Sequence, residues 1–541
     1  MNKIDKPKLK GVDFDAVVLG AGFGGLYSVH KLRNELGLHV QAYEKGEDVG
    51  GTWYWNRYPG ALSDTESHIY RLSFDKEFLQ EETWKNRYIT QPEIMQHFRR
   101  MAERFDLRRS YQFNTMVTSA HFNEENNFWE IKTNKGDRVT AKFLVTGLGL
   151  LSATNIPDIK GRETFKGEQY HTSQWPSNVS LEGKRVGVIG NGSTGVQIIT
   201  AIAPVVKHLT VFQRTPQYSV PAGQRPLSEV EIAAIKNNYD EVWDQVFSSA
   251  TCFGFEESTV VGASVSEEER ERVFEENWNK GGGFRFMLGT FCDVITNLEV
   301  NEAACEFIRK KIREIVKDPE VARKLSPTDL YLKRPLCDNG YYETFNRENV
   351  SLADIKEHPI IEFTPKGIKT TEGEHELDVI IYATGFDAIE GSYLRMDIRG
   401  RKGLTLREKW ADVPTGYFGM TTTGFPNMFM ILGPHGPFSS LPPVIETQVD
   451  WISDSVKYTL DQEFETIEPS AAAEKEWIET CDMTANYTLF PKGNAWFFGA
   501  NIPGKNVANR LYYGGVANYR KVLKDFGYSG FIFNNVKSKQ V

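Results

Sequence analysis

The chain has 541 residues, of which 40% are hydrophobic and 25% are charged, and its formal net charge is −9 at pH 7. This length predicts two or three domains, and the lack of a basic run excludes the phosphate-neutralising surface that nucleic-acid binding requires. No segment approaches the roughly 20 apolar residues that span a bilayer, and residues 1–15 lack a signal-peptide core, so no membrane association is expected.

The first predicted element is a strand over Ala16–Leu19, which leads into the turn Gly20-x-Gly22-x-x-Gly25 and then into a helix. A strand, a tight turn and a helix N-terminus in this order bind a pyrophosphate. Glu44 follows Gly25 by 19 residues, at the end of the next strand. A carboxylate there bonds the hydroxyls of a ribose and repels a 2′-phosphate, which predicts an adenine nucleotide without that phosphate. Because a second nucleotide unit follows in the same chain, the expected nucleotide is FAD.

The loop after Glu44 reads GEDVGGTWYWNRYPGALSDTES. Its glycines permit close backbone approach, and its aromatic residues are expected to cover the flavin ring. The FAD contacts predicted in this loop are Gly51, Thr52, Trp53 and Asp64.

A second unit of the same kind begins with a strand over Val186–Ile189. Arg214 follows its turn by 19 residues, where the first unit has an acid. A guanidinium at this place suits a 2′-phosphate, which predicts NADPH. Two such units in one chain imply that hydride passes between two cofactors. The contacts predicted in the second turn are Gly190, Gly192, Ser193, Thr194 and Gly195.

Residues 226–330 are charged and have helical periodicity, with Gly281 to Gly283 as a break, which predicts a helical insertion. A buried strand over Val379–Tyr382 then returns the chain to a dinucleotide domain, with Asp387 behind it as a cofactor contact. The predicted fold is α/β, with two Rossmann-like dinucleotide-binding domains (FAD and NADP) and a helical insertion. Its expected parts are FAD domain 1–150, NADP domain 151–225, insertion 226–330, NADP domain 331–384 and FAD domain 385–541.

The five cysteines are scattered and form no CxxC pair. This pattern predicts a reducing cytoplasm, without a disulfide framework or a metal site. It also argues against a disulfide reductase, which needs a redox-active cysteine pair beside the flavin.

The stretch FKGEQYHTSQWP has the form FxGxxxHxxxWP through Phe165, Gly167, His171, Trp175 and Pro176. This is the fingerprint of the Baeyer–Villiger monooxygenases, which the chain resembles along nearly its whole length. Within that family it is similar to the enzymes that act on cyclohexanone. Other matching segments are GGTWYWNRYPGALSDTES, YLKRPLCDNGYYETFNRENV, PNMFMILGPHGPFSSLPP and WFFGANIPGK.

The resemblance implies an enzyme that uses FAD, NADPH and O2 to convert ketones, cyclic ones above all, to esters or lactones. In the family, a flavin C4a-peroxide attacks the ketone and gives a tetrahedral (Criegee) intermediate. The expected state is a monomer. The alternative is an N- or S-oxygenating flavin-containing monooxygenase, which would keep both glycine turns without needing Arg334 or the Trp-Pro ending.

The resemblance also implies roles for single residues. Arg334 would be the cation beside the flavin, oriented by Asp64, although a purely structural ion pair is the alternative. His171 would couple the two nucleotide domains at their joint, by hydrogen bonds from its imidazole to backbone. Asn191 departs from the smaller residue common in relatives. The nucleotide would be held through Arg214, Thr215, Lys333 and Trp496, and Phe438 and Leu441 would shape the ketone pocket.

Overall fold

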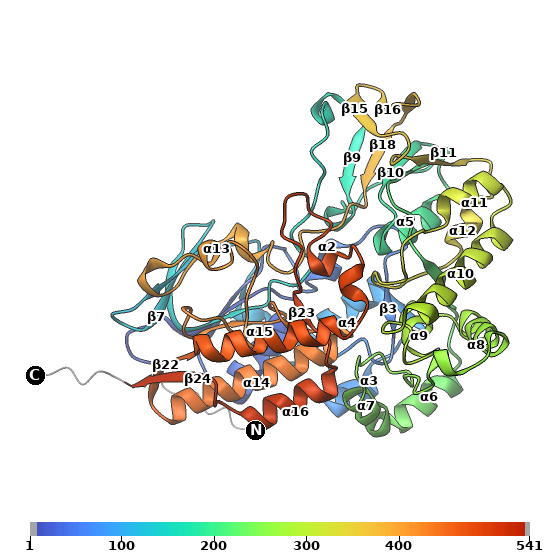
Figure 1. Cartoon of the computed structure of the whole chain (residues 1–541). Helices are drawn as coiled ribbons and strands as arrows, with labels where there is room; N and C mark the ends of the chain where they lie inside the picture. The colour runs from blue at the N-terminus through green and yellow to red at the C-terminus, as the bar shows by residue number, and fades with distance from the viewer. Residues whose placement is uncertain (1–7, 536–541) are drawn as a thin grey trace, which may run out of the picture.

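The structure, a computed structural model, describes residues 8–535 and is built around two sheets that lie in different parts of the molecule (Figure 1). The first seven residues of the segment considered for a targeting signal lie outside this range. Within residues 8–535, no helix is both long enough and apolar enough to cross a membrane.

The first sheet combines strands from both halves of the chain. Its order is β19-β6-β7-β8-β1-β2-β5, and β20 also pairs with β8. Residues 16–19 of β1 (AVVL) form a continuous apolar run because the strand is buried between two parallel neighbours, with Ala16 opposite Val40 and Phe143. The strands are β1 (Phe14–Leu19), β2 (Val40–Tyr43), β5 (Tyr111–Gln112), β6 (Val117–Asn123), β7 (Phe128–Thr133), β8 (Arg138–Thr146), β19 (Asp397–Arg399) and β20 (Met428–Met430).

Helices from both halves of the chain cover this sheet. Leu26 of α1, Phe98 of α4 and Val449 of α14 belong to one apolar core with the strand residues Val18 and Val145. Figure 1 shows α14, α15 and α16 side by side beneath the sheet. The helices are α1 (Phe23–Val29), α4 (Gln91–Arg104), α14 (Leu441–Asp461), α15 (Ala471–Asn486) and α16 (Val516–Phe526).

The second sheet is entirely parallel, in the order β14-β11-β10-β18-β9. Its central strand β10 leads through the second glycine turn into α5 (Ser193–Ile202). The predicted strand Val379–Tyr382 is confirmed as β18, and residues of FKGEQYHTSQWP form β9 beside it. The strands are β9 (Glu168–His171), β10 (Arg185–Ile189), β11 (His208–Gln213), β14 (Val350–Asp354) and β18 (Val379–Tyr382).

The helical periodicity of residues 226–330 is confirmed, but the helices do not form one unit. Trp243 of α7 packs into the core of the first sheet, whereas Phe274 of α8 and Phe307 of α10 pack into that of the second. Gly281 and Gly282, with φ of 74° and 102°, separate α8 from α9. The helices are α6 (Glu229–Asn237), α7 (Tyr239–Ser248), α8 (Glu267–Lys280), α9 (Gly283–Leu288), α10 (Leu298–Ile315) and α11 (Pro319–Leu325).

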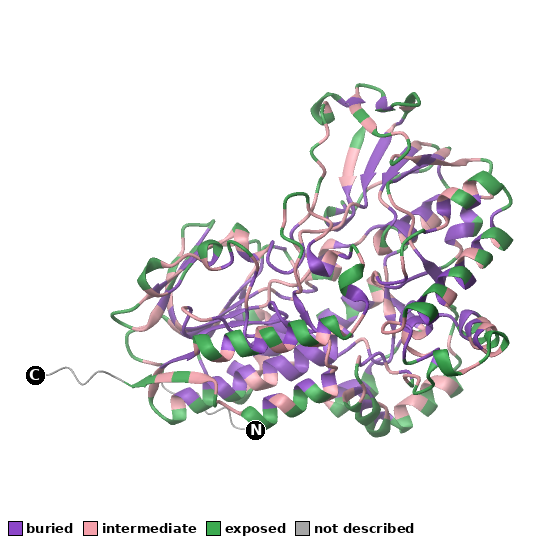
Figure 2. Ribbon diagram, viewed as in Figure 1, coloured by how far each residue is buried: buried purple, intermediate pink, exposed green. Residues whose placement is uncertain are grey.

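Two chain crossings run side by side between the sheets. Thr154 forms a β-bridge with Phe386, and the Asn155 N–H donates to the Gly385 carbonyl at 2.9 Å. Buried residues fill the two sheets and the helix faces turned toward them, so each sheet has its own interior (Figure 2). The predicted α/β class with two strand-turn-helix units is therefore confirmed.

Shorter elements complete the chain between these cores. They are α2 (Thr52–Trp55), α3 (Lys76–Glu81), α12 (Tyr341–Thr344), α13 (Leu406–Lys409), β3 (Leu62–Glu66), β4 (Tyr88–Thr90), β12 (Ser219–Pro221), β13 (Leu336–Asp338), β15 (Ile360–Thr364), β16 (Gly367–Thr370), β17 (Glu374–Glu376), β21 (Gly436–Pro437), β22 (Phe464–Pro469), β23 (Leu511–Tyr512) and β24 (Phe531–Asn535).

Candidate active site between the two sheets

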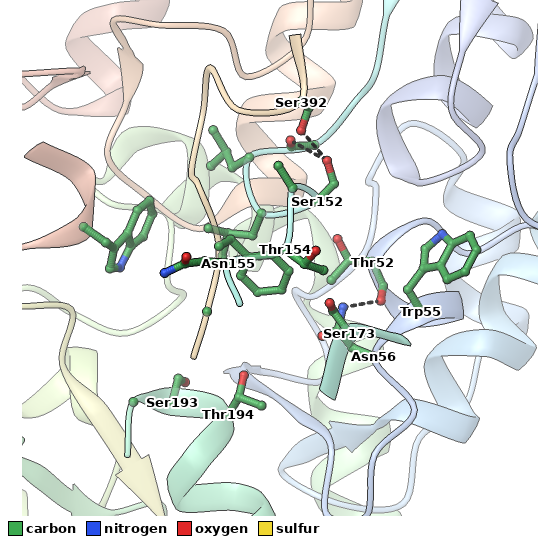
Figure 3. A pocket seen from close by; sticks show the side chains of 18 of the residues that line it. Thr52, Trp55, Asn56, Ser152, Thr154, Asn155, Ser173, Ser193, Thr194 and Ser392 are labelled. Atoms are coloured by element: carbon green, nitrogen blue, oxygen red, sulfur yellow. Dashed lines mark hydrogen bonds between the residues drawn. The ribbon is translucent and has the colours of Figure 1, made fainter. Parts of the chain in front are cut away.

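A cavity of about 1310 Å³ runs past both glycine turns. Figure 3 shows Thr52 and Asn56 on one side of it, Ser193 and Thr194 on another, and Asn155 from a crossing segment between them. The cavity therefore joins the carboxyl end of β1 to that of β10, where parallel α/β sheets bind ligands.

The glycines of the first turn let its backbone pack closely enough to hold a nucleotide. Gly20 has φ of 96°, and a Cβ on it would lie 2.4 Å from the Gly147 carbonyl oxygen. Gly25 lies outside the cavity lining, and its Cβ would lie 1.8 Å from the Gly20 carbonyl oxygen, so it permits the close packing of helix on strand. Backbone amides of a turn packed this tightly can approach a pyrophosphate.

Glu44 lines the cavity beside this turn and is 5% exposed. Its carboxylate oxygens accept from the Ala21 N–H at 2.8 Å and from the Gly46 N–H at 2.7 Å. Burial raises the pKa of Glu44, and these two amides oppose the increase. The side chain is thus fixed at the position expected for the ribose hydroxyls.

The second turn has the same construction. Gly190 has φ of 102°, and its Cβ would lie 2.5 Å from the Ala383 carbonyl oxygen, whereas a Cβ on Gly192 would meet nothing within 4 Å. Gly195, like Gly25, permits helix packing and does not line the cavity. Asn191 lines the cavity but is buried, and its side chain is held by donating to the side-chain oxygen of Gln213 at 2.9 Å.

Two cationic side chains, Arg214 and Lys333, line the cavity near this second turn together with Thr215. Lys333 pairs with Asp329 at 2.8 Å. Lys356 also lines this part of the cavity. The sequence did not predict it, because it follows β14, the fourth strand of this sheet along the chain, and not the strand with the glycine turn. On the other side, sequence reasoning missed Lys45 and Arg395, although the position of Lys45 directly after Glu44 was a usable signal.

Arg334 lines the cavity beside the second turn. Its Nη1 donates to the Ser193 hydroxyl at 2.7 Å, and its Nη2 pairs with Asp64. All three residues line the cavity, and the Arg334 and Asp64 side chains are 27% and 14% exposed. The Phe284 ring lies 5.6 Å from the Arg334 Cζ. Because the guanidinium is fixed on two sides, it forms a pre-oriented cation in the cavity wall.

The other predicted site residues divide into two groups. Gly51, Thr52, Trp53, Leu441 and Trp496 line the cavity. Asp387 and Phe438 do not line it. The Asp387 carboxylate instead accepts from Lys505 at 2.5 Å, and Phe438 packs among Phe284, Phe490 and Phe497.

His171 lies at the joint between the sheets, opposite Tyr382 in the pairing of β9 with β18. The ring is 5% exposed, and its Nδ1 accepts from the Ser173 N–H at 3.2 Å, a bond within its own segment. Nε2 has no hydrogen-bond partner within residues 8–535. Burial lowers the pKa of His171 to about 4, against the influence of the Gly385 and Asn155 backbone, so the ring is neutral at pH 7.

These residues fit two dinucleotides. Each end of the cavity has a glycine cradle at the start of a helix, one with a fixed carboxylate and the other with cations. Among residues 8–535, no group of three or more His, Cys, Asp or Glu side chains could hold a metal ion.

The chain is similar to known proteins along its whole length. A sequence model of the flavin-binding monooxygenase-like family matches residues 15–220. The chain is 57% identical to a Baeyer–Villiger monooxygenase of Pseudooceanicola batsensis over 539 residues, 99% of each chain. It is 52% identical to a phenazine N-monooxygenase of Lysobacter antibioticus over 532 residues, 98% of each. The NADP⁺-bound crystal structure of cyclohexanone monooxygenase from Rhodococcus sp. Phi1 aligns with a TM-score of 0.96 and 58% identity, covering 98% of this chain and all of that one.

Proposed function

Since this chain belongs to the Baeyer–Villiger monooxygenases, we propose that Arg334 is the residue around which it oxidises cyclic ketones to lactones. The enzyme depends on FAD and NADPH. When bound, the flavin would supply the redox chemistry, which is to accept hydride from NADPH and to activate O2. The protein supplies binding, orientation, charge and the exclusion of water.

The fixed position of Arg334 supports this proposal more than any other observation. Negative charge grows on the ketone oxygen when a nucleophilic oxygen bonds to the carbonyl carbon and the C=O π electrons move to that oxygen, and a cation already in place stabilises this charge. Arginine suits the role because its pKa of about 12 or above keeps it charged, so it does not donate a proton to a reacting oxygen. Asp64 and Ser193 restrain the guanidinium, which lowers the cost of reorganisation.

The nucleotides are bound at the two ends of the cavity. Glu44 takes the ribose of the FAD adenosine, and the turn beginning at Gly20 takes its pyrophosphate. Arg214, Thr215 and Lys333 bind the 2′-phosphate of NADPH at the other end, where all three line the cavity. His171 couples the two nucleotide domains, whose predicted boundaries follow the two sheets, because β9 carries it into the joint.

The segment with Trp496 excludes water. Trp496 begins a short 3-10 turn, Trp496–Phe498, and lines the cavity, while Phe497 and Phe498 are buried behind it. Closure matters because water in the site diverts reducing equivalents to hydrogen peroxide. Leu441, at the start of α14, lines the cavity and shapes the ketone pocket directly, whereas Phe438 acts on the pocket from behind its wall, through its packing on Phe284.

Incubating the purified holoenzyme with NADPH, O2 and cyclohexanone tests the activity. The seven-membered lactone should form with one NADPH oxidised per ester bond. Arg334→Ala should retain FAD and lose lactone formation by at least about 100-fold, the scale of removing one charge-stabilising group. A lactone yield near that of the wild type in Arg334→Ala would refute the role of the guanidinium.

N-oxygenation is a second candidate because one 52% identical relative is a phenazine N-monooxygenase. The two functions separate when phenazine and cyclohexanone are supplied in parallel and NADPH-dependent products are identified. An N-oxide without lactone would favour the second function, and lactone without an N-oxide the first.

A cytoplasmic monomer is the state proposed for the enzyme. All five cysteines are free and four of them are buried, which is consistent with a reducing compartment. Light scattering of the purified holoenzyme would determine the oligomeric state, and fractionation of the source cells would determine the compartment.

A further inference from the structure

Strand β3 carries two carboxylates that each bind an arginine from a different part of the chain. We propose that Glu66 is a positioning residue for the oxygenation, because through Arg285 it fixes helix α9 and thereby the Phe284 ring against Arg334. The inference rests on the proposed function of Arg334.

The two carboxylates lie two residues apart on β3. Asp64 and Glu66 are both partly buried, and the pairing of β3 with β4 shifts register between Leu62 and Glu66. Asp64 pairs with Arg334. Glu66 Oε1 accepts from Arg285 Nη2 at 3.0 Å and from Arg87 Nη2 at 3.0 Å. One short strand thus sets the relative positions of the site arginine and of α9.

Glu66 restrains the chain on both sides of the Gly281-Gly282 break. Arg87, held by Glu66, donates through Nη1 to the Lys280 carbonyl at 2.5 Å, at the end of α8. Arg285, held by the same oxygen, lies in the first turn of α9. Both residues have positive φ, and glycine has the most permissive backbone of any residue. Phe274 and Trp278 of α8 pack on Phe286 of α9, and Glu66 adds the ionic restraint on this pair of helices, which its removal would abolish.

Helix α9 passes this restraint to the site through aromatic contacts. Phe284 stacks on Phe253 with centroids 3.9 Å apart and planes at 19°, and the Arg285 guanidinium lies 5.0 Å from the Phe255 ring. Phe284 also packs against Phe438, with centroids 6.3 Å apart, and its ring lies 5.6 Å from the Arg334 Cζ. A shift of α9 would therefore remove the ring that packs against the guanidinium.

The charge balance gives Glu66 a larger effect than an exposed pair would have. Its side chain is 20% exposed, and those of Arg87, Arg285 and His68 are 13%, 24% and 11% exposed. Burial raises the pKa of Glu66, but His68 and the two arginines outweigh burial and lower it. Removing this carboxylate would leave two partly buried guanidinium groups facing each other without a counter-ion.

The test compares Glu66→Gln and Arg285→Met in the holoenzyme with the matched control Arg270→Met. Arg270 also belongs to the insertion, is 11% exposed, pairs with one glutamate and leaves its Nε without a partner among the described residues, as Arg285 does. Both test variants should raise the KM for cyclohexanone about tenfold and lower the lactone formed per NADPH oxidised by about half or more. FAD content and the KM for NADPH should stay at wild-type values, and Arg285→Lys should restore most of the coupling.

Hydrogen exchange over residues 281–291 provides a readout independent of turnover. It should speed up in Glu66→Gln and in Arg285→Met, and the double variant should be no worse than either single one. Wild-type coupling and exchange in both variants would overturn the proposal, and so would additive losses in the double variant. If the wild type forms no lactone, the proposed function fails, whereas the exchange data still determine whether Glu66 positions α9.

Discussion

Glu446 makes the stability of the flavin side of the molecule depend on pH. It lies on α14 next to Ile445, which lines the cavity, and is 6% exposed. Its carboxylate accepts from the Ser73 N–H and hydroxyl, both at 2.5 Å. Burial raises the pKa of Glu446 from its ordinary 4.5 to about 7, although the bonds from Ser73 oppose the increase. At about 1.4 kcal/mol per pH unit, this difference corresponds to about 3 kcal/mol.

Proton binding determines whether the free energy of unfolding rises or falls with pH. Between pH 4.5 and about 7 the folded protein holds a proton that the unfolded chain releases. The stabilisation is therefore complete below pH 4.5 and is lost as the pH rises through about 7. Glu446→Gln should remove this dependence, because glutamine can accept from the Ser73 N–H and donate to its hydroxyl without ionising.

Urea unfolding of the holoenzyme, followed by flavin fluorescence at about pH 5 and about pH 8, measures the effect. Between these two pH values the free energy of unfolding of the wild type should fall by about 3 kcal/mol because of Glu446, and that of Glu446→Gln should not show this fall. Glu476→Gln is the control, because Glu476 is an exposed residue of α15, and it should keep the wild-type pH dependence. The same pH dependence in Glu446→Gln as in wild type would refute the reasoning.

Two further predictions concern the nucleotides. Arg214→Ala should weaken NADP⁺ binding, measured by calorimetry, by about 10- to 100-fold, because a charge-assisted bond contributes about 1.5–3 kcal/mol, and NADH binding should hardly change. Equal losses for both nucleotides would contradict recognition of the 2′-phosphate. Gly20→Ala should purify without flavin, since its Cβ would meet the Gly147 carbonyl at 2.4 Å, whereas Gly136→Ala, with φ of 92° and open space around it, should keep FAD. Flavin absorbance of the two proteins tests this, and a Gly20→Ala protein as yellow as wild type would contradict it.

Local sequence patterns predicted the parts of the site that the backbone determines. The turn at Gly20 was predictable because its positive φ requires glycine. The strand Val379–Tyr382 was predictable because a strand buried on both faces is a continuous apolar run. Each of these signals lies within a few residues of sequence. The packing of α7 against the first sheet was not predicted, because an amphipathic period shows that a helix buries a face but not what covers it.

Side-chain pairs between distant segments were the least predictable features. Asp387 was predicted as a cofactor contact from its place behind a strand, yet it pairs with Lys505, 118 residues away, and does not line the cavity. Its role in cofactor binding stays a prediction. Neither this pair nor that of Glu66 with Arg285, 219 residues apart, leaves a periodic trace in the sequence, because tertiary packing alone brings the partners together.

Arg334 links the second nucleotide unit to strand β3. One of its nitrogens bonds Ser193, at the start of the helix that follows β10, and another pairs with Asp64 on β3, a strand of the separate two-stranded sheet β3-β4. A guanidinium cannot keep both bonds if β3 moves relative to that helix by more than the tolerance of a hydrogen bond, a few tenths of an ångström. The guanidinium is therefore fixed only when β3 and the second glycine turn are in register, so the charge stabilisation proposed for Arg334 depends on that register.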